Sequence, residues 1–180
     1  GVGESRLSKT FTNNLLLVNY LPGLLANRGC RVLEASQQQI KKACLRNLKA
    51  AGALQGAHDA GKGMLLFYSA ECGLKYLIMK DRAEKTTQRV ADEFGHNIRR
   101  LVAEAKISRS ELSQPHSTDN KTVDFPMIRR SGQINSFPIT EFHVAMRYGV
   151  DLERDDETNA LEFFDRLAAA VRSRIFDRAT

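Results

Sequence analysis

Apolar residues recur along most of this chain at the three- and four-residue spacing of an α-helix. One apolar stripe covers residues 36–54 and a second covers residues 156–176, each with polar residues on the opposite face. A third stripe covers residues 92–106, where Gly95 moves the expected helix start to about His96. These three segments therefore predict amphipathic helices.

Residues 64–80 form the most apolar stretch and predict a central, buried helix, because they are hydrophobic on nearly every side. The internal charges, Glu71 and Lys75, stand four apart in the order that favours a helical ion pair, which contributes about 0.3–0.5 kcal/mol when exposed. The chain lacks Asn-Gly and Asp-Gly hairpin turns and shows little strand-like alternation. The pattern predicts an all-α fold, an up-and-down bundle of four to five helices with a long polar loop.

Three segments interrupt the helical pattern. Residues 1–35 predict an N-terminal arm or short helix that serves assembly, because the apolar run over residues 14–25 contains Pro22 and Gly23. Residues 108–136 predict the long polar loop, and residues 137–148 predict either a strand or a helical turn. The helical bundle is therefore expected over residues 36–180.

Composition narrows the class of protein. The chain has 180 residues, of which 42% are hydrophobic and 27% are charged, as in ordinary globular domains. It shows no apolar run of the roughly 20 residues that a membrane span needs and no secretory signal. Three widely spaced cysteines are typical of reduced thiols rather than a disulfide framework. We expect a cytoplasmic protein without a membrane partner.

Lysine and arginine outnumber aspartate and glutamate by 27 to 21, which gives a formal net charge of +6 and weakly favours a polyanionic partner such as RNA. The candidate phosphate-binding face follows the central helix. A solvated helical surface is the alternative, because Glu84, Glu93 and Glu104 are interleaved with the basic residues. The basic candidates are Lys80, Arg82, Lys85, Arg99 and Arg100.

Motifs for cofactors and metals are weak. Residues 56–63 contain three glycines and Lys62 and resemble a phosphate-binding loop, but Gly63 stands where the magnesium-binding hydroxyl belongs and a helix precedes the loop instead of a strand. A glycine-rich turn between helices is the favoured interpretation. The histidines lack metal-site spacing and the cysteines form no Cys-x-x-Cys pair. We therefore expect no metal and no cofactor.

Two short segments carry a family resemblance. Residues 67–77 read Phe-Tyr-Ser-Ala-Glu-Cys-Gly-Leu-Lys-Tyr-Leu, and residues 95–101 read Gly-His-Asn-Ile-Arg-Arg-Leu. Arg147 and Tyr148, a loop and the last amphipathic helix follow. This order resembles the HEPN superfamily of small helical domains over about residues 36–176. The resemblance implies a helical bundle in which Arg147 and Tyr148 belong to the binding surface.

The HEPN resemblance implies one of two functions. The ribonuclease branch is metal-independent, acts as a dimer and uses an Arg-x4–6-His motif, in which histidine moves a proton and arginine stabilises the phosphorane. The candidate pairs here are Arg89 with His96 and Arg109 with His116. No histidine follows Arg147, where the nuclease motif normally falls, and this departure favours the non-nuclease branch.

Three hypotheses follow for the function. The first is a non-catalytic binding and assembly subunit of a toxin–antitoxin or antiphage-type system, forming a homodimer or a hetero-oligomer with a protein partner. The second is a metal-independent ribonuclease toxin. The third is a nucleic-acid-binding adaptor whose affinity falls steeply with salt.

Overall fold

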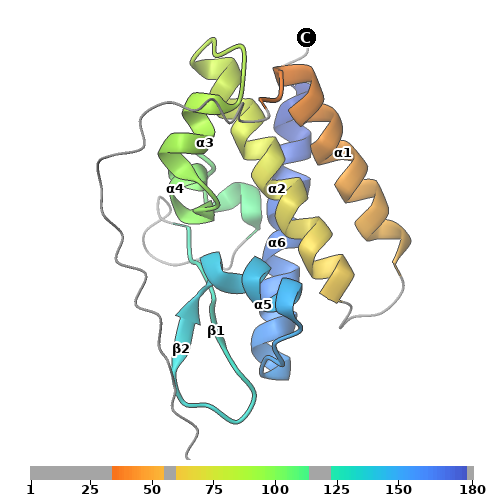
Figure 1. Ribbon diagram of the computed structural model, residues 1–180, viewed down its shortest axis with the longest axis vertical. Helices are drawn as coiled ribbons and strands as arrows, with labels where there is room; N and C mark the ends of the chain where they lie inside the picture. Colours follow the sequence, from red (N-terminus) through yellow and green to blue (C-terminus); the bar gives the residue numbers. More distant parts are fainter. Residues whose placement is uncertain (1–33, 55–59, 114–122, 178–180) are drawn as a thin grey trace, which may run out of the picture. The chain divides into compact units, whose positions relative to one another are not determined.

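The computed structural model describes residues 34–54, 60–113 and 123–177, and this part of the chain is predominantly α-helical (Figure 1). The long helices are α1 (Gln37–Ala53), α2 (Ala60–Asp81) and α6 (Arg154–Asp177). The short helices are α3 (Gln88–Phe94), α4 (Ile98–Glu104) and α5 (Phe142–Tyr148). The predicted all-α class is confirmed.

A small antiparallel sheet accompanies the helices. Strand β1 (Met127–Arg129) pairs with β2 (Ser136–Pro138), and Ile128 lies opposite Phe137. Two 3-10 turns, η1 (Ser110–Leu112) and η2 (Ile139–Glu141), complete the regular elements of the described residues. The segment predicted as one long polar loop thus contains η1 and β1, because Ile128 and Leu112 are buried against the helices.

Helix α2 packs against both α1 and α6, and α6 lies behind α2 in the view of Figure 1. The Ser69 hydroxyl donates a 3.0 Å hydrogen bond to the Cys44 carbonyl, while Gln37 donates to the Glu84 carbonyl at 2.7 Å. The start of α1 therefore lies beside the end of α2, and these two helices are antiparallel. The Ser36 side chain begins α1 with a capping box to Gln39.

Helix α6 runs parallel to α2. The rings of Phe67 and Phe164 are 5.2 Å apart, and six residues further along α2 Gly73 faces Val171. A Cβ at Gly73 would lie 2.2 Å from Val171 Cγ1 and 2.9 Å from Cys44 Sγ. Only glycine fits this position without displacing α1 or α6.

The helix expected to begin near His96 is α4, and the residues before Gly95 belong to a separate helix, α3. Gly95 takes a φ of +54° at the end of α3, and the Asn97 side chain then caps α4 by accepting a 3.1 Å hydrogen bond from the Arg100 amide. The expected glycine turn is wrong in part, because Gly61 and Gly63 lie inside α2. Residues 55–59, and residues 1–33 of the expected arm, lie outside the described residues.

Arg174 fastens α6 to the segment that follows α4. The guanidinium donates to the carbonyls of Ala105 and Lys106, each at 2.6 Å, and pairs with Glu111. Burial alone raises the pKa of the Glu111 carboxyl, but hydrogen bonds from Arg174 and Ser108 outweigh it and lower the pKa to about 2. This network fixes the position of Arg109, which directly precedes η1.

We expect Gly73→Ala to lower the free energy of unfolding by about 1–3 kcal/mol, because the added methyl group overpacks the three-helix contact. Alanine is the better helix former, so the expected loss is a packing effect. Chemical denaturation measures it. Gly52→Ala in α1 is the matched control, since a Cβ there meets nothing within 4 Å. This control should raise stability by about 0.5–1 kcal/mol; a similar gain for Gly73→Ala would contradict the close approach.

Candidate functional site

Two opposite charges lie inside the fold on α2. Glu71 and Lys75 are 5% and 8% exposed, and Lys75 Nζ lies 2.5 Å from Glu71 Oε1. The expected ion pair therefore forms, and it is buried along with the rest of the central helix, so the small free energy of an exposed pair does not apply to it. A buried pair of this kind is tolerated only when each charge neutralises the other.

His96 completes this cluster from the junction between α3 and α4. The Nδ1 atom lies 3.0 Å from Glu71 Oε2. A carboxylate only accepts hydrogen bonds, so Nδ1 carries a proton and donates it to Glu71, and Nε2 points away from this contact. The His96 side chain is 58% exposed, so the imidazole is open to solvent while Glu71 holds it from behind.

His143 on α5 stands beside His96, with ring centroids 5.1 Å apart. The ring also stacks on Phe67 at 4.5 Å, and Nδ1 donates to the Thr140 carbonyl at 2.8 Å. Burial is the main cause that lowers the pKa of His143 below 6.5, and the nearby His96 adds to it, against the opposing effects of Thr140 and the carboxylates. His143 is therefore mainly a neutral imidazole at pH 7.

The His96–His143 cluster, defined as Glu71, Lys75, His96 and His143, permits two kinds of role. Glu71 and His96 together join the α3–α4 junction to the central helix, which is a structural role. A histidine held by a carboxylate through Nδ1 also has the arrangement of a general base. Among residues 34–54, 60–113 and 123–177, no group of three or more histidine, cysteine or acidic side chains is placed to hold a metal ion.

The catalytic pairs expected from the sequence are held by separate partners. Arg89 lies on α3, is 82% exposed and sits 3.5 Å from Glu84, while His96 is bound to Glu71. Arg109 is buried and pairs with Asp124 at 2.6 Å. His116 lies outside the described residues.

Arg82 and Arg100, two of the expected phosphate-binding residues, are used within the fold. Arg82 pairs with Glu93 and Glu104, each at 2.6 Å, and Arg100 donates to the Glu93 carbonyl at 2.8 Å. Both guanidinium groups also lie over the ring of Phe94. For these two arginines the alternative, a helical surface on which acidic residues are interleaved with basic ones, is the better description.

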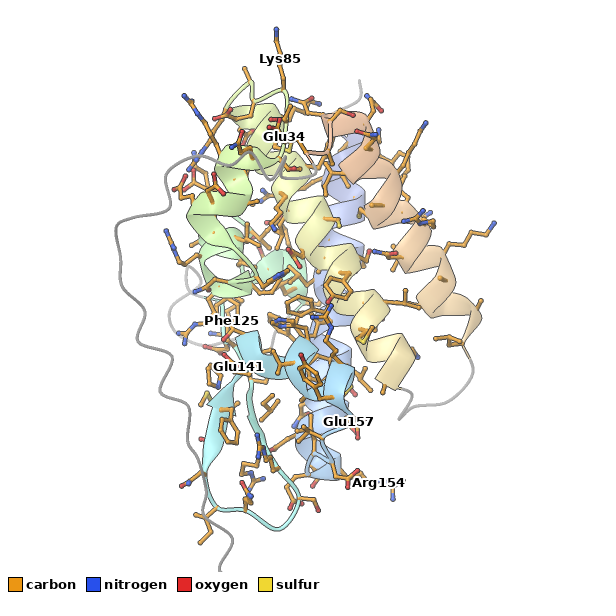
Figure 2. All side chains as sticks on the ribbon, in the orientation of Figure 1. Glu34, Lys85, Phe125, Glu141, Arg154 and Glu157 are labelled. Carbon is orange, nitrogen blue, oxygen red and sulfur yellow. The ribbon has the colours of Figure 1, made fainter. Side chains whose placement is uncertain are left out.

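The other basic candidates point outward. Lys80 is exposed at the end of α2, and Lys85 extends from the turn between α2 and α3 (Figure 2). Arg99 lies over the ring of Phe125 at 5.2 Å. Arg147 is exposed at the end of α5, and Tyr148 beside it is 72% exposed. Within the described part of the chain, Lys85, Arg99 and Arg147 make no ion pair with a carboxylate.

Sequence reasoning missed His143 as a member of the cluster. The sequence pattern that could have pointed to His143 is its spacing of four residues from Arg147, which places the two side chains on the same face of α5. Contact with His96 depends on how α5 packs against α2, and no local pattern encodes that packing. Glu71 and Lys75 were predicted as an ion pair from their spacing, but the contact of Glu71 with His96 was not.

Comparison with protein-family models, with curated proteins and with solved structures finds no match for this chain. The resemblance to HEPN domains therefore stays a prediction. Within the described residues, no helix combines the length and the apolar character needed to cross a bilayer.

We expect Glu71→Gln to lower the free energy of unfolding by about 3–5 kcal/mol, because the Lys75 ammonium is left buried without a counter-charge. Adding Lys75→Met should restore part of the loss, since the unpaired charge is then gone. Chemical denaturation of the single and double variants measures both effects. Glu162→Gln, which removes the exposed partner 3.6 Å from Arg166, is the control and should change stability by less than about 1 kcal/mol. Equal losses for the two glutamates would contradict a buried, coupled pair.

Proposed function

We propose that this chain is a non-catalytic helical binding and assembly subunit of a toxin–antitoxin or antiphage-type system, and that it contacts RNA. The resemblance of the α2 segment and the Gly95–His96 segment to the non-nuclease branch of HEPN domains supports the type of system. Geometry supports the binding role.

One observation carries the non-catalytic role: each arginine and histidine described here from the expected catalytic pairs has a carboxylate partner of its own. Arg89 is near Glu84, His96 is bound to Glu71, and Arg109 is bound to Asp124. The Arg-x4–6-His motif expected from the resemblance works with its arginine beside its histidine, so that charge stabilisation and proton transfer act on one phosphate. The pairing seen here favours holding the fold together instead.

RNA contact is supported by the outward basic side chains. Lys85, Arg99 and Arg147 come from three different segments and have no carboxylate partner within the described residues. Such cations release the counterions of a phosphate backbone when they bind it, which makes affinity depend on salt. The net charge of +6 adds a favourable long-range field.

Binding of the full chain to a labelled single-stranded RNA, measured by fluorescence anisotropy at several salt concentrations, tests this function. Arg147→Gln should weaken binding and reduce the slope of log K against log salt by about 0.7, the value for one phosphate contact on a single strand. Arg129→Gln is the matched control, because Arg129 is already paired with Asp156 at 2.8 Å. A chain that sediments as a monomer, binds no RNA and retains no protein partner would contradict the proposal.

A second candidate, metal-independent RNA cleavage, is favoured by the contact between His96 and His143. In this reaction His96 Nε2 takes the proton of a ribose 2′-hydroxyl, and the resulting oxygen attacks the adjacent phosphorus. The bond to the leaving 5′-oxygen breaks, and protonated His143 supplies that oxygen with a proton. The products are a 2′,3′-cyclic phosphate and a 5′-hydroxyl end.

Incubating RNA with the chain in the presence of EDTA separates the two candidates. If cleavage is the function, His96→Ala and His143→Ala should each slow it by about 100-fold or more. Cleavage should also slow as the pH rises from 7.5 to 8.5, because the lowered pKa of His143 makes its protonated form steadily scarcer above neutrality. Equal rates in wild type and both variants, or no cleavage at all, would exclude this candidate.

A further inference from the structure

Two arginines, Arg109 and Arg166, line a cavity that is separate from the His96–His143 cluster. The arginine pocket, as we call it, has a volume of about 300 Å³ and lies between α6 and the segment that leads into β1. This volume is at the lower end of small-molecule sites. Its lining residues are Arg109, Asp124, Phe125, Pro126, Asn159, Phe163 and Arg166.

Three segments that are distant in sequence supply the walls. Asn159, Phe163 and Arg166 stand at helical spacing on one face of α6. Phe125, labelled in Figure 2, and Pro126 line the cavity from the segment before β1, and the proline favours an extended backbone at Phe125. The pocket thus offers the aromatic rings of Phe125 and Phe163 and the side-chain amide of Asn159, and two of these three residues lie on the long helix α6.

The cationic side chains of the pocket suit an anion. Arg109 is only 8% exposed, although it faces the cavity, and Arg166 Nε is buried with no hydrogen-bond partner among the described residues. The contact between Arg166 and Glu162 is long, at 3.6 Å, and half-exposed, so it holds the guanidinium weakly. Arg166 can therefore donate hydrogen bonds to a ligand while losing only a weak ion pair with Glu162.

Arg99 adds a third positive charge beside the same aromatic ring, 5.2 Å from the centroid of Phe125. Counting only residues that the structure describes, three guanidinium groups and two carboxylates, Asp124 and Glu162, lie here, which is an excess of one positive charge. An anionic group in the cavity would be attracted by both arginines that line it, and it would offer an acceptor to the buried Nε of Arg166.

From these features we infer that the arginine pocket binds a nucleoside monophosphate unit, either free or as one nucleotide of an RNA strand. The phosphate is held by Arg166 with Arg109, the base lies against Phe125 and Phe163, and Asn159 is placed to donate to or accept from the base edge. This inference adds a binding site for one nucleotide to the proposed function. Its version with an RNA strand rests on that proposed function, whereas binding of a free nucleotide does not.

Calorimetric titration of the full chain tests the pocket with four probes: adenosine 5′-monophosphate, uridine 5′-monophosphate, adenosine and inorganic phosphate. Both nucleotides should bind, and adenosine should bind at least about tenfold more weakly, because it lacks the charged group that Arg166 contacts. Arg166→Met should weaken binding of adenosine monophosphate by about tenfold or more. Absence of nucleotide binding at millimolar concentration, or equal affinity for adenosine, would overturn the inference.

Arg172→Met is the matched control on the same helix, because Arg172 lies over Phe176 and does not line the arginine pocket. It should change nucleotide affinity by less than about twofold, and denaturation of both variants should show comparable stability. Equal weakening by the two substitutions would overturn the assignment of the phosphate to Arg166.

RNA binding separates this inference from the proposed function. If wild type binds RNA with the expected salt dependence while neither nucleotide binds and Arg166→Met is unchanged, the pocket fails and the proposed function stands. If nucleotides bind in an Arg166-dependent way but RNA does not, the pocket stands as a free-nucleotide site and RNA contact fails. Displacement of bound RNA by adenosine monophosphate would identify the pocket as the seat of an RNA nucleotide.

Discussion

The fold depends on the ion pair between Glu71 and Lys75, since it allows α2 to be buried on nearly all sides. A helix in this position normally carries no charge, because each isolated ion would lose several kcal/mol of hydration. Here the two charges lie one helical turn apart and cancel. The second carboxylate oxygen of Glu71 then remains available to His96.

That second oxygen links the core to the surface. His96 follows Gly95, whose positive φ ends α3, so the hydrogen bond to Glu71 fixes the point where the chain turns into α4. His143 lies against His96 and is stacked on Phe67 of the central helix. The same contacts thus serve packing and place two imidazoles side by side, which is why stability and chemistry have to be measured separately at this cluster.

The arginines fall into two groups that the net charge does not distinguish. Arg82, Arg129 and Arg174 pair with carboxylates and hold elements of the fold together. Arg99 and Arg166 are bound to the protein less firmly, by a ring contact and by a long, half-exposed ion pair. The arginines of the first group have their hydrogen bonds committed to the fold, so a charge count overstates the surface available for binding a phosphate.

The sequence alone determined the helical class, the approximate extents of α1, α2 and α6, and the burial of α2, because apolar periodicity is a local property of the chain. It also placed Glu84, Glu93 and Glu104 among the basic residues, which anticipated the pairing of Arg82. Tertiary structure alone decided that the Glu71–Lys75 pair is buried and that His143 meets His96. It also decided that Arg109 and Arg166 line one cavity, since these residues are far apart along the chain and only helix packing brings them together.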